Sequence, residues 1–173
     1  MDMLGTRSLL SGMVLAIAAV LEIVLSFVFY REDGALAARN VGWVVLWVSA
    51  AFGWLPILFF KKWGGVPKGK AYVHTTTLVS RGVYGIVRHP QYLVGILLGA
   101  GLALIAQHWL VAVLGVVVIL MSYSYTFEEE RVLEEKFGVE YEAYRERVPR
   151  VNFVAGIAKL LLRGRRENGG RAL

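Results

Sequence analysis

The stretch that decides the fold runs from Tyr92 to Phe127 and reads YLVGILLGAGLALIAQHWLVAVLGVVVILMSYSYTF. It consists of two uncharged apolar runs, 92–106 and 109–127, which only Gln107 and His108 clearly separate. An apolar segment of this kind is typical of a membrane helix, so the pair predicts a tight helical hairpin in a bilayer. Small residues, which allow membrane helices to approach closely, recur in it: Gly95, Gly99, Gly101 and Gly115.

Two further apolar spans precede the hairpin. One covers residues 8–30 with a single charge, Glu22, and the other covers residues 40–60 with none. Both exceed the roughly 18 residues expected of a transmembrane helix. The first is too long for a signal peptide, and no clear small-residue cleavage site follows it. We therefore predict an all-α integral membrane bundle, a single domain of about four transmembrane helices: 8–30, 40–60, 92–106 and 109–127.

The composition supports a membrane protein and excludes several other classes. Of the 173 residues, 57% are hydrophobic and 18% are charged, whereas a soluble domain averages about 45–50% and 25%. Disordered chains are poor in apolar residues, so disorder is excluded. The absence of cysteine excludes a disulfide scaffold, thiolate metal sites and cysteine nucleophiles. In so apolar a chain, the net charge of +6 favours contact with anionic lipid over nucleic acid.

Lysine and arginine are distributed unevenly along the chain. The loop between the first two spans has Arg31 and Arg39, offset by Glu32 and Asp33, and the hairpin turn has none. Ten basic residues follow the hairpin, and six lie between the second span and the hairpin: Lys61, Lys62, Lys68, Lys70, Arg81 and Arg88. Because basic loops stay in the cytoplasm, both termini and any polar active site are predicted to be cytoplasmic.

The polar segments also have a predicted organisation. Residues 61–79 are rich in Gly and Lys and are expected to form an interfacial loop. Residues 128–137 lack Gly and Pro, so the last span should continue as a helix to Gly138, a natural C-cap. A short helix over 140–147 should then end before Pro149. Within 154–173, the apolar stretch 154–162 is flanked by basic residues and should lie on the membrane surface, followed by a tail.

The segment RGVYGIVRHPQY (81–92), directly before the hairpin, is the first candidate for chemistry. Pro90 suits the first turn of a helix. The free N–H groups and positive dipole end there favour an anionic ligand group, and Arg88 and His89 add donors. The alternative is a basic membrane anchor beside an interfacial tyrosine.

Three other features allow two interpretations each. Gly99-Ala100-Gly101 permits either a ligand close to bare backbone or close helix packing. The acidic run 128–130 is either a site for a cation or ribose hydroxyls or a solvated face with pairs such as Arg131 and Glu135. Glu22 is a functional candidate because an acid inside a membrane is costly, but it can instead lie near one leaflet or pair with the hairpin. His74 and His108 lack metal-ligand spacing, so no metal site is predicted.

Together, RGVYGIVRHPQY (81–92), EEERVLEEKFG (128–138) and EYEAYRERVP (140–149) resemble the integral membrane methyltransferases of the isoprenylcysteine carboxyl methyltransferase and phospholipid methyltransferase superfamily. The resemblance implies S-adenosylmethionine (SAM) bound between the hairpin and the cytoplasmic segment 128–153. It implies catalytic roles for Arg88 and Arg147. The cofactor-binding residues that we expect on this basis are Tyr84, Arg88, His89, Tyr92, Leu93, Gly99, Gly101, Glu129 and Glu130.

The acceptor expected from this resemblance is lipophilic and enters sideways from the membrane. A prenylated-cysteine carboxylate held by an arginine is the first candidate, and a phospholipid amine is the second. A carboxylate needs no base, whereas an amine must lose a proton before it attacks, so Glu130 or His89 would matter more. An NADPH-dependent membrane reductase and a membrane bundle without enzymatic activity remain alternatives. The glycine-rich faces permit a dimer without requiring one.

Overall fold

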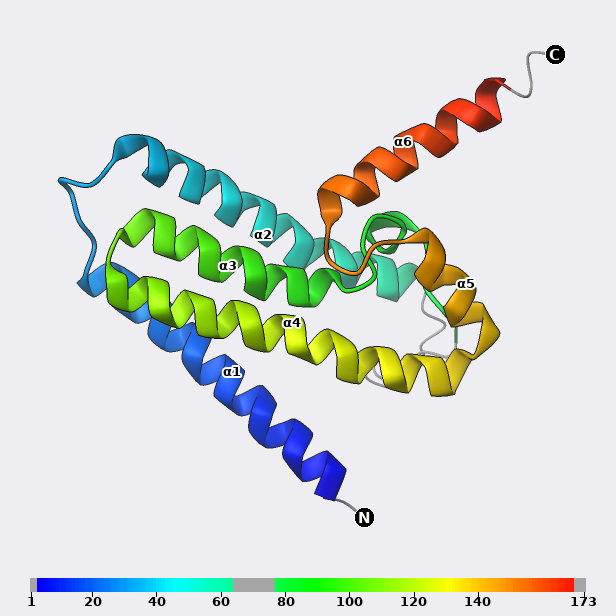
Figure 1. The fold of residues 1–173 in the computed structure, drawn as a ribbon, viewed down its shortest axis with the longest axis horizontal. Coiled ribbons are helices and arrows are strands. Elements are labelled where there is room, and N and C mark those ends of the chain that lie inside the picture. Colours follow the sequence, from blue (N-terminus) through cyan, green and yellow to red (C-terminus); the bar gives the residue numbers. More distant parts are fainter. Residues whose placement is uncertain (1–2, 64–76, 170–173) are drawn as a thin grey trace. The chain divides into compact units, whose positions relative to one another are not determined.

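The computed structural model describes residues 3–63 and 77–169, and this part of the chain is helical and contains no strand (Figure 1). The all-α prediction is therefore confirmed for it. The elements are α1 (Met3–Val28), α2 (Leu36–Trp63), the 3-10 helix η2 (Gly82–Gly85), α3 (Pro90–Ala106), α4 (Trp109–Phe137), α5 (Val139–Arg147) and α6 (Phe153–Gly169).

The predicted boundaries need two corrections. The first helix ends at Val28 rather than at residue 30, because the chain turns before the polar stretch Arg31–Gly34. Residues 61–63, predicted to be loop, continue α2, while residues 64–76 of that segment lie outside the described residues. The predicted continuation of the last span is confirmed, since α4 runs unbroken to Phe137 and Gly138 follows with φ +50°. Helix α6 extends beyond the predicted apolar stretch to Gly169.

Two of the four predicted spans are long and apolar enough in the structure to cross a membrane: Leu36–Phe59 in α2 and Trp109–Phe137 in α4. The other two, Gly12–Val28 and Pro90–Ala106, are shorter apolar helices. Large apolar side chains are exposed on these helices, among them Phe27 and Trp47, at 79% and 73%. Such a surface is unusual in water and suits contact with lipid.

The chain forms two compact units, which are described separately: Met1–Ala51 with Tyr92–Tyr125, and Phe52–Gln91 with Thr126–Leu173. In the first unit, glycines allow the helices to touch. A Cβ on Gly99 would lie 2.8 Å from the Gly115 carbonyl oxygen, so α3 and α4 meet backbone to backbone. A Cβ on Gly101 would lie 3.2 Å from the carbonyl oxygen of Gly42 on α2. Figure 1 shows α3 and α4 running antiparallel from their short turn.

The first unit also contains the buried acid. Glu22 on α1 is fully buried, and its Oε1 lies 2.8 Å from the position that a Cβ on Gly115 would take. Neither carboxylate oxygen has a hydrogen-bond partner among the described residues. The suggested pairing of Glu22 with a side chain of the hairpin is therefore not seen there.

The two turns of the first unit are joined to each other. The Ala35 N–H donates to the side-chain oxygen of Gln107 at 2.7 Å, and the Gln107 amide donates back to the Ala35 carbonyl at 2.9 Å. Beside them, the His108 ring stacks on Phe29 with centroids 4.3 Å apart. The α1–α2 turn and the α3–α4 turn therefore lie at the same end of this unit.

In the second unit, α5 packs against the segment that precedes α3. Acidic residues in the first turn of α5 and basic residues in its last turn complement the helix dipole. The helix ends at Arg147 because Val148, which precedes Pro149, takes an extended conformation. A core forms around Tyr141, Tyr144 and Val148. The partly buried side chains that pack against it are Leu78, Leu133 and Phe137.

Candidate cofactor site

The second unit fixes the Arg-His-Pro segment by backbone contacts to the chain that follows α5. The N–H groups of Arg88 and His89 donate to the carbonyls of Pro149 and Arg150, at 3.0 and 3.1 Å. The buried Tyr144 hydroxyl donates to the Tyr84 carbonyl at 2.7 Å. The N–H groups of residues 88 and 89 are therefore used within the protein, and at these two positions only the side chains remain for a ligand.

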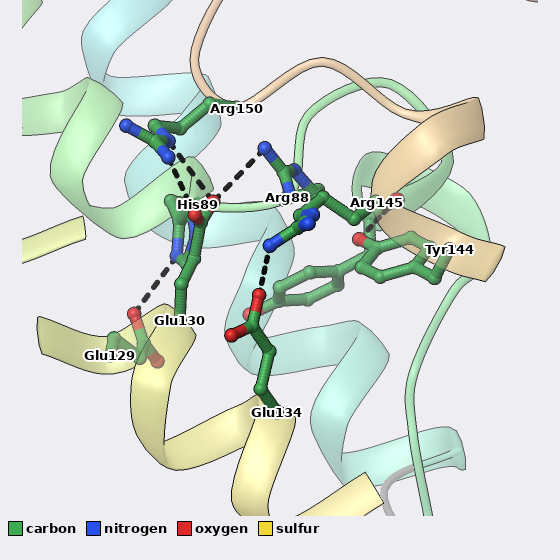
Figure 2. Close-up of polar contacts among 9 residues, drawn as sticks. Arg88, His89, Glu129, Glu130, Glu134, Tyr144, Arg145 and Arg150 are labelled. Atoms are coloured by element: carbon green, nitrogen blue, oxygen red, sulfur yellow. Dashed lines mark hydrogen bonds and ion pairs between the residues drawn. The ribbon is translucent and has the colours of Figure 1, made fainter. Parts of the chain in front are cut away.

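Glu130, on the extension of α4, is the centre of the site (Figure 2). Its side chain is 6% exposed, and both oxygens face cations. Arg150 donates from Nε to Oε1 at 3.0 Å and from Nη2 to Oε2 at 2.6 Å. Arg88 Nη2 forms an ion pair with Oε1 at 3.0 Å. We call these residues, together with His89 and Glu129, the Glu130 cluster.

His89 bridges the two acids of α4. Its buried ring places Nδ1 3.0 Å from Glu129 Oε2 and Nε2 3.2 Å from Glu130 Oε1. A carboxylate only accepts hydrogen bonds, whereas a neutral imidazole has a single N–H. His89 therefore links the two acids of α4, and the tautomer of its ring decides which nitrogen donates.

Glu129 differs from its neighbour in what remains accessible. Its side chain is 43% exposed, compared with 6% for Glu130, and its described partner is His89. Glu128 is exposed outside the cluster. Of the two acids predicted to hold the cofactor, Glu129 thus has carboxylate surface left for a cationic or hydroxyl-bearing ligand.

Two buried side chains, one in this cluster and one in α5, have hydrogen-bond donors with no partner among the described residues. They are Arg88, through Nε and Nη1, and Tyr141, through its hydroxyl. The Arg88 side chain is 7% exposed, and Tyr141 is fully buried. Burial, followed by the negative charge of Glu130, raises the pKa of Tyr141, so its hydroxyl stays protonated.

The structure brings together five of the predicted site residues in the second unit: Tyr84, Arg88, His89, Glu129 and Glu130. Arg147 is exposed in α5, where its Nε donates to the Ala143 carbonyl of the same helix. The catalytic role of Arg147 stays a prediction.

The other predicted residues belong to the first unit. The Tyr92 ring stacks near Tyr125 with centroids 6.1 Å apart, and Leu93 is buried. Gly99 and Gly101 contact neighbouring helices, so helix packing is sufficient to explain them. Contact of these four residues with the cofactor also stays a prediction.

Arg150 is the main residue that the sequence reasoning missed. Besides holding Glu130, its guanidinium lies over the Phe127 ring, 3.9 Å from the centroid. Arg150 directly follows the EYEAYRERVP motif, and this position next to the motif was the available signal. Tyr141 lies within the same motif, and the sequence predicts no role for it.

The second unit therefore combines an accessible carboxylate with buried, unpartnered donors next to several cations. Such a site suits a ligand that carries both a cationic and an anionic group.

Comparison with known proteins agrees with these motifs. A sequence model of the family described as phospholipid methyltransferase matches residues 41–140, which is more than half of the chain. Searches of curated proteins and of solved structures found no significant match.

Proposed function

The chain belongs to the phospholipid methyltransferase family, and from this premise we propose that it methylates the amine of a phospholipid, with SAM held at the Glu130 cluster. Family membership makes the chain a SAM-dependent methyltransferase of the membrane. The reductase and the bundle without enzymatic activity are thereby set aside. This location is supported by the partly exposed carboxylate of Glu129 together with the donor atoms of Arg88 that lack partners among the described residues.

The side chains present fit SAM in charge and in chemistry. Its amino-acid part carries an ammonium and a carboxylate, and the cluster offers a carboxylate at Glu129 and buried donors at Arg88. When bound, SAM supplies an electrophilic methyl group on sulfur. The protein contributes position and electrostatics, which matter because methyl transfer requires an in-line approach of the acceptor.

Within this site we assign different roles to the two acids. Glu129 contacts the cofactor through its ammonium or its ribose hydroxyls, because its carboxylate is partly exposed. Glu130 positions Arg88 and His89, because its own oxygens are occupied by Arg88, His89 and Arg150. This assignment refines the expectation that both acids bind the cofactor.

A phospholipid amine is favoured over a prenylated-cysteine carboxylate as the acceptor. Phospholipid methylation is the activity that gives the family its name. The expectation of a carboxylate acceptor depends on Arg88 and Arg147. Of these, Arg147 is exposed, and its Nε donates to a carbonyl of its own helix. Two arginines, the buried Arg88 and the partly buried Arg150, already face the carboxylate of Glu130.

An amine acceptor must lose a proton before it attacks. Glu130 is poorly suited to take that proton because two guanidinium groups, those of Arg88 and Arg150, form ion pairs with its oxygens. Glu129 is better suited, since part of its carboxylate is open and His89 bonds to one of its oxygens. We therefore assign the proton-accepting role to Glu129, oriented by His89.

We further propose four membrane crossings, with both termini and the Glu130 cluster in the cytoplasm. The link between Gln107 and Ala35 supports this, because it sets the two turns of the first unit at one end. The 17-residue helix α3 is about 25 Å long at 1.5 Å per residue, slightly less than a hydrocarbon core of about 30 Å. The lipid acceptor then enters laterally, and SAM enters from the cytoplasm.

Transfer of a labelled methyl group tests the proposed function. The purified protein in proteoliposomes is given labelled SAM and one acceptor at a time: an aminophospholipid, a prenylcysteine analogue or a small soluble thiol. The proposal expects label in the aminophospholipid. Transfer only to the prenylcysteine analogue would show that the acceptor is a prenylated carboxylate and not a phospholipid amine. Transfer only to the soluble thiol would contradict the proposal that a lipid acceptor enters laterally from the membrane.

A further inference from the structure

Arg88 and Tyr141 have buried donors that the fold itself does not use. The Nε and Nη1 atoms of Arg88 and the hydroxyl of Tyr141 lack partners among the described residues. Leaving a buried polar group unsatisfied costs about 1–3 kcal/mol, and more when the group is charged. Three such atoms on two buried side chains of the second unit suggest that a ligand completes them.

Their chemistry determines which kind of ligand that is. The guanidinium of Arg88 has donors only and remains charged. The hydroxyl of Tyr141 remains protonated, as described above, and is therefore available as a donor. The positive charge of Arg88 opposes the rise in the pKa of Tyr141, so the two groups interact electrostatically. A ligand that satisfies them must supply acceptor oxygens, and a negative charge would offset the positive charge of Arg88.

The carboxylate oxygens of Glu130, the buried acid of the cluster, are already used. Arg150 binds both oxygens of Glu130, and Oε1 also faces Arg88 and His89. Glu129 contacts His89. The buried Tyr144 hydroxyl, which lies close to Tyr141 in α5, differs in having a protein acceptor, the Tyr84 carbonyl. Tyr144 is therefore a matched internal comparison for Tyr141.

We propose that Nε and Nη1 of Arg88 and the hydroxyl of Tyr141 form an oxyanion subsite that takes a carboxylate or phosphate group of a substrate. This deepens the proposed function and rests on it. Two oxyanions are available in that reaction: the carboxylate of SAM and the phosphodiester of the lipid acceptor. Tyr141 thereby becomes a binding residue rather than only a core aromatic.

Replacing single hydroxyl groups tests the subsite in the full-length protein in nanodiscs. Tyr141→Phe should leave the melting temperature without ligand unchanged or slightly higher, because it removes an unsatisfied hydroxyl. Tyr144→Phe should lower it, because the Tyr84 carbonyl loses its donor. For each variant we would measure Kd for SAM, Kd for decarboxylated SAM, and KM for phosphatidylethanolamine.

If the subsite binds the SAM carboxylate, Tyr141→Phe weakens SAM binding on the order of ten-fold and leaves decarboxylated SAM unaffected. If it binds the lipid phosphate, KM for the phospholipid rises by a similar factor while Kd for SAM stays constant. If Tyr141→Phe equals wild type in all three constants, the subsite is wrong and the proposed function stands. If wild type does not bind SAM, the proposed function fails and the subsite with it.

Discussion

Arg150 binds both oxygens of Glu130 from twenty residues further along the chain, through Nε at 3.0 Å and Nη2 at 2.6 Å. This two-point contact joins the end of α4 to the segment after α5. The same segment accepts the backbone N–H groups of Arg88 and His89 through its carbonyls. The carboxylate of Glu130 and the segment around Arg150 therefore hold the Arg-His-Pro motif in place together.

Arg150→Ala should lower both stability and SAM affinity. The variant removes a two-point partner from a buried carboxylate, while Arg88 and His89 remain, so we expect a loss on the order of 2 kcal/mol in unfolding free energy. SAM affinity should fall because Arg88 and His89 are no longer held in position. Arg147→Ala is the control and should change both quantities less. If thermal-shift and binding measurements showed a larger loss of stability and SAM affinity for Arg147→Ala than for Arg150→Ala, Arg147 would be the more important arginine.

Glu130→Gln should be mainly a stability variant. It removes the negative charge that the buried Arg88 and the partly buried Arg150 share, and breaking a buried charge pair costs on the order of 3 kcal/mol. Chemical denaturation in detergent should show this loss with and without SAM. A variant as stable as wild type but unable to bind SAM would make Glu130 a direct cofactor ligand.

Gly99→Ala should destabilise the protein whether or not SAM is present. The new Cβ would lie 2.8 Å from the Gly115 carbonyl oxygen, and overpacking of this kind costs about 1–3 kcal/mol. Gly12→Ala is the matched control, because a Cβ there meets nothing within 4 Å. Normal melting of Gly99→Ala together with impaired SAM binding would support the cofactor role instead.

The proposed topology places the α1–α2 turn and α5 on opposite sides of the membrane. The chain contains no cysteine, so Asp33→Cys and Glu140→Cys each carry the single thiol of the molecule. An impermeant maleimide added to sealed, oriented vesicles should label one variant directly and the other only after permeabilisation. Labelling of both from the same side is incompatible with four crossings.

Much of the helical architecture could be predicted because it depends on local pattern. Apolar runs located α1 to α4, and the absence of Gly and Pro after residue 127 predicted the continuation of α4 to Phe137. The charged motifs likewise indicated that Arg88, His89, Glu129 and Glu130 belong to one site, and the structure brings these four residues into contact. These signals depend on residue type and short spacing, which the sequence displays directly.

The partners of individual side chains could not be predicted in this way. The contact of Arg150 with Glu130 depends on the chain reversal at Gly138 and on the extended residue Val148. The resemblance assigned the second catalytic role to Arg147, although its Nε bonds to its own helix. The two interpretations of Gly99, a ligand contact and a helix contact, differ in which group lies against its Cα. That depends on how the helices pack, which the local sequence does not show.

The central claim is that the Glu130 cluster holds SAM, and calorimetric titration of Glu129→Gln with SAM tests it most directly. Glu129 has the accessible carboxylate of the cluster, and losing a charged hydrogen bond should weaken SAM binding about ten-fold or more with little change in melting temperature. Glu128→Gln, at an exposed position next to it, should bind as wild type does. Equal SAM affinity for wild type, Glu129→Gln and Glu128→Gln would contradict the account.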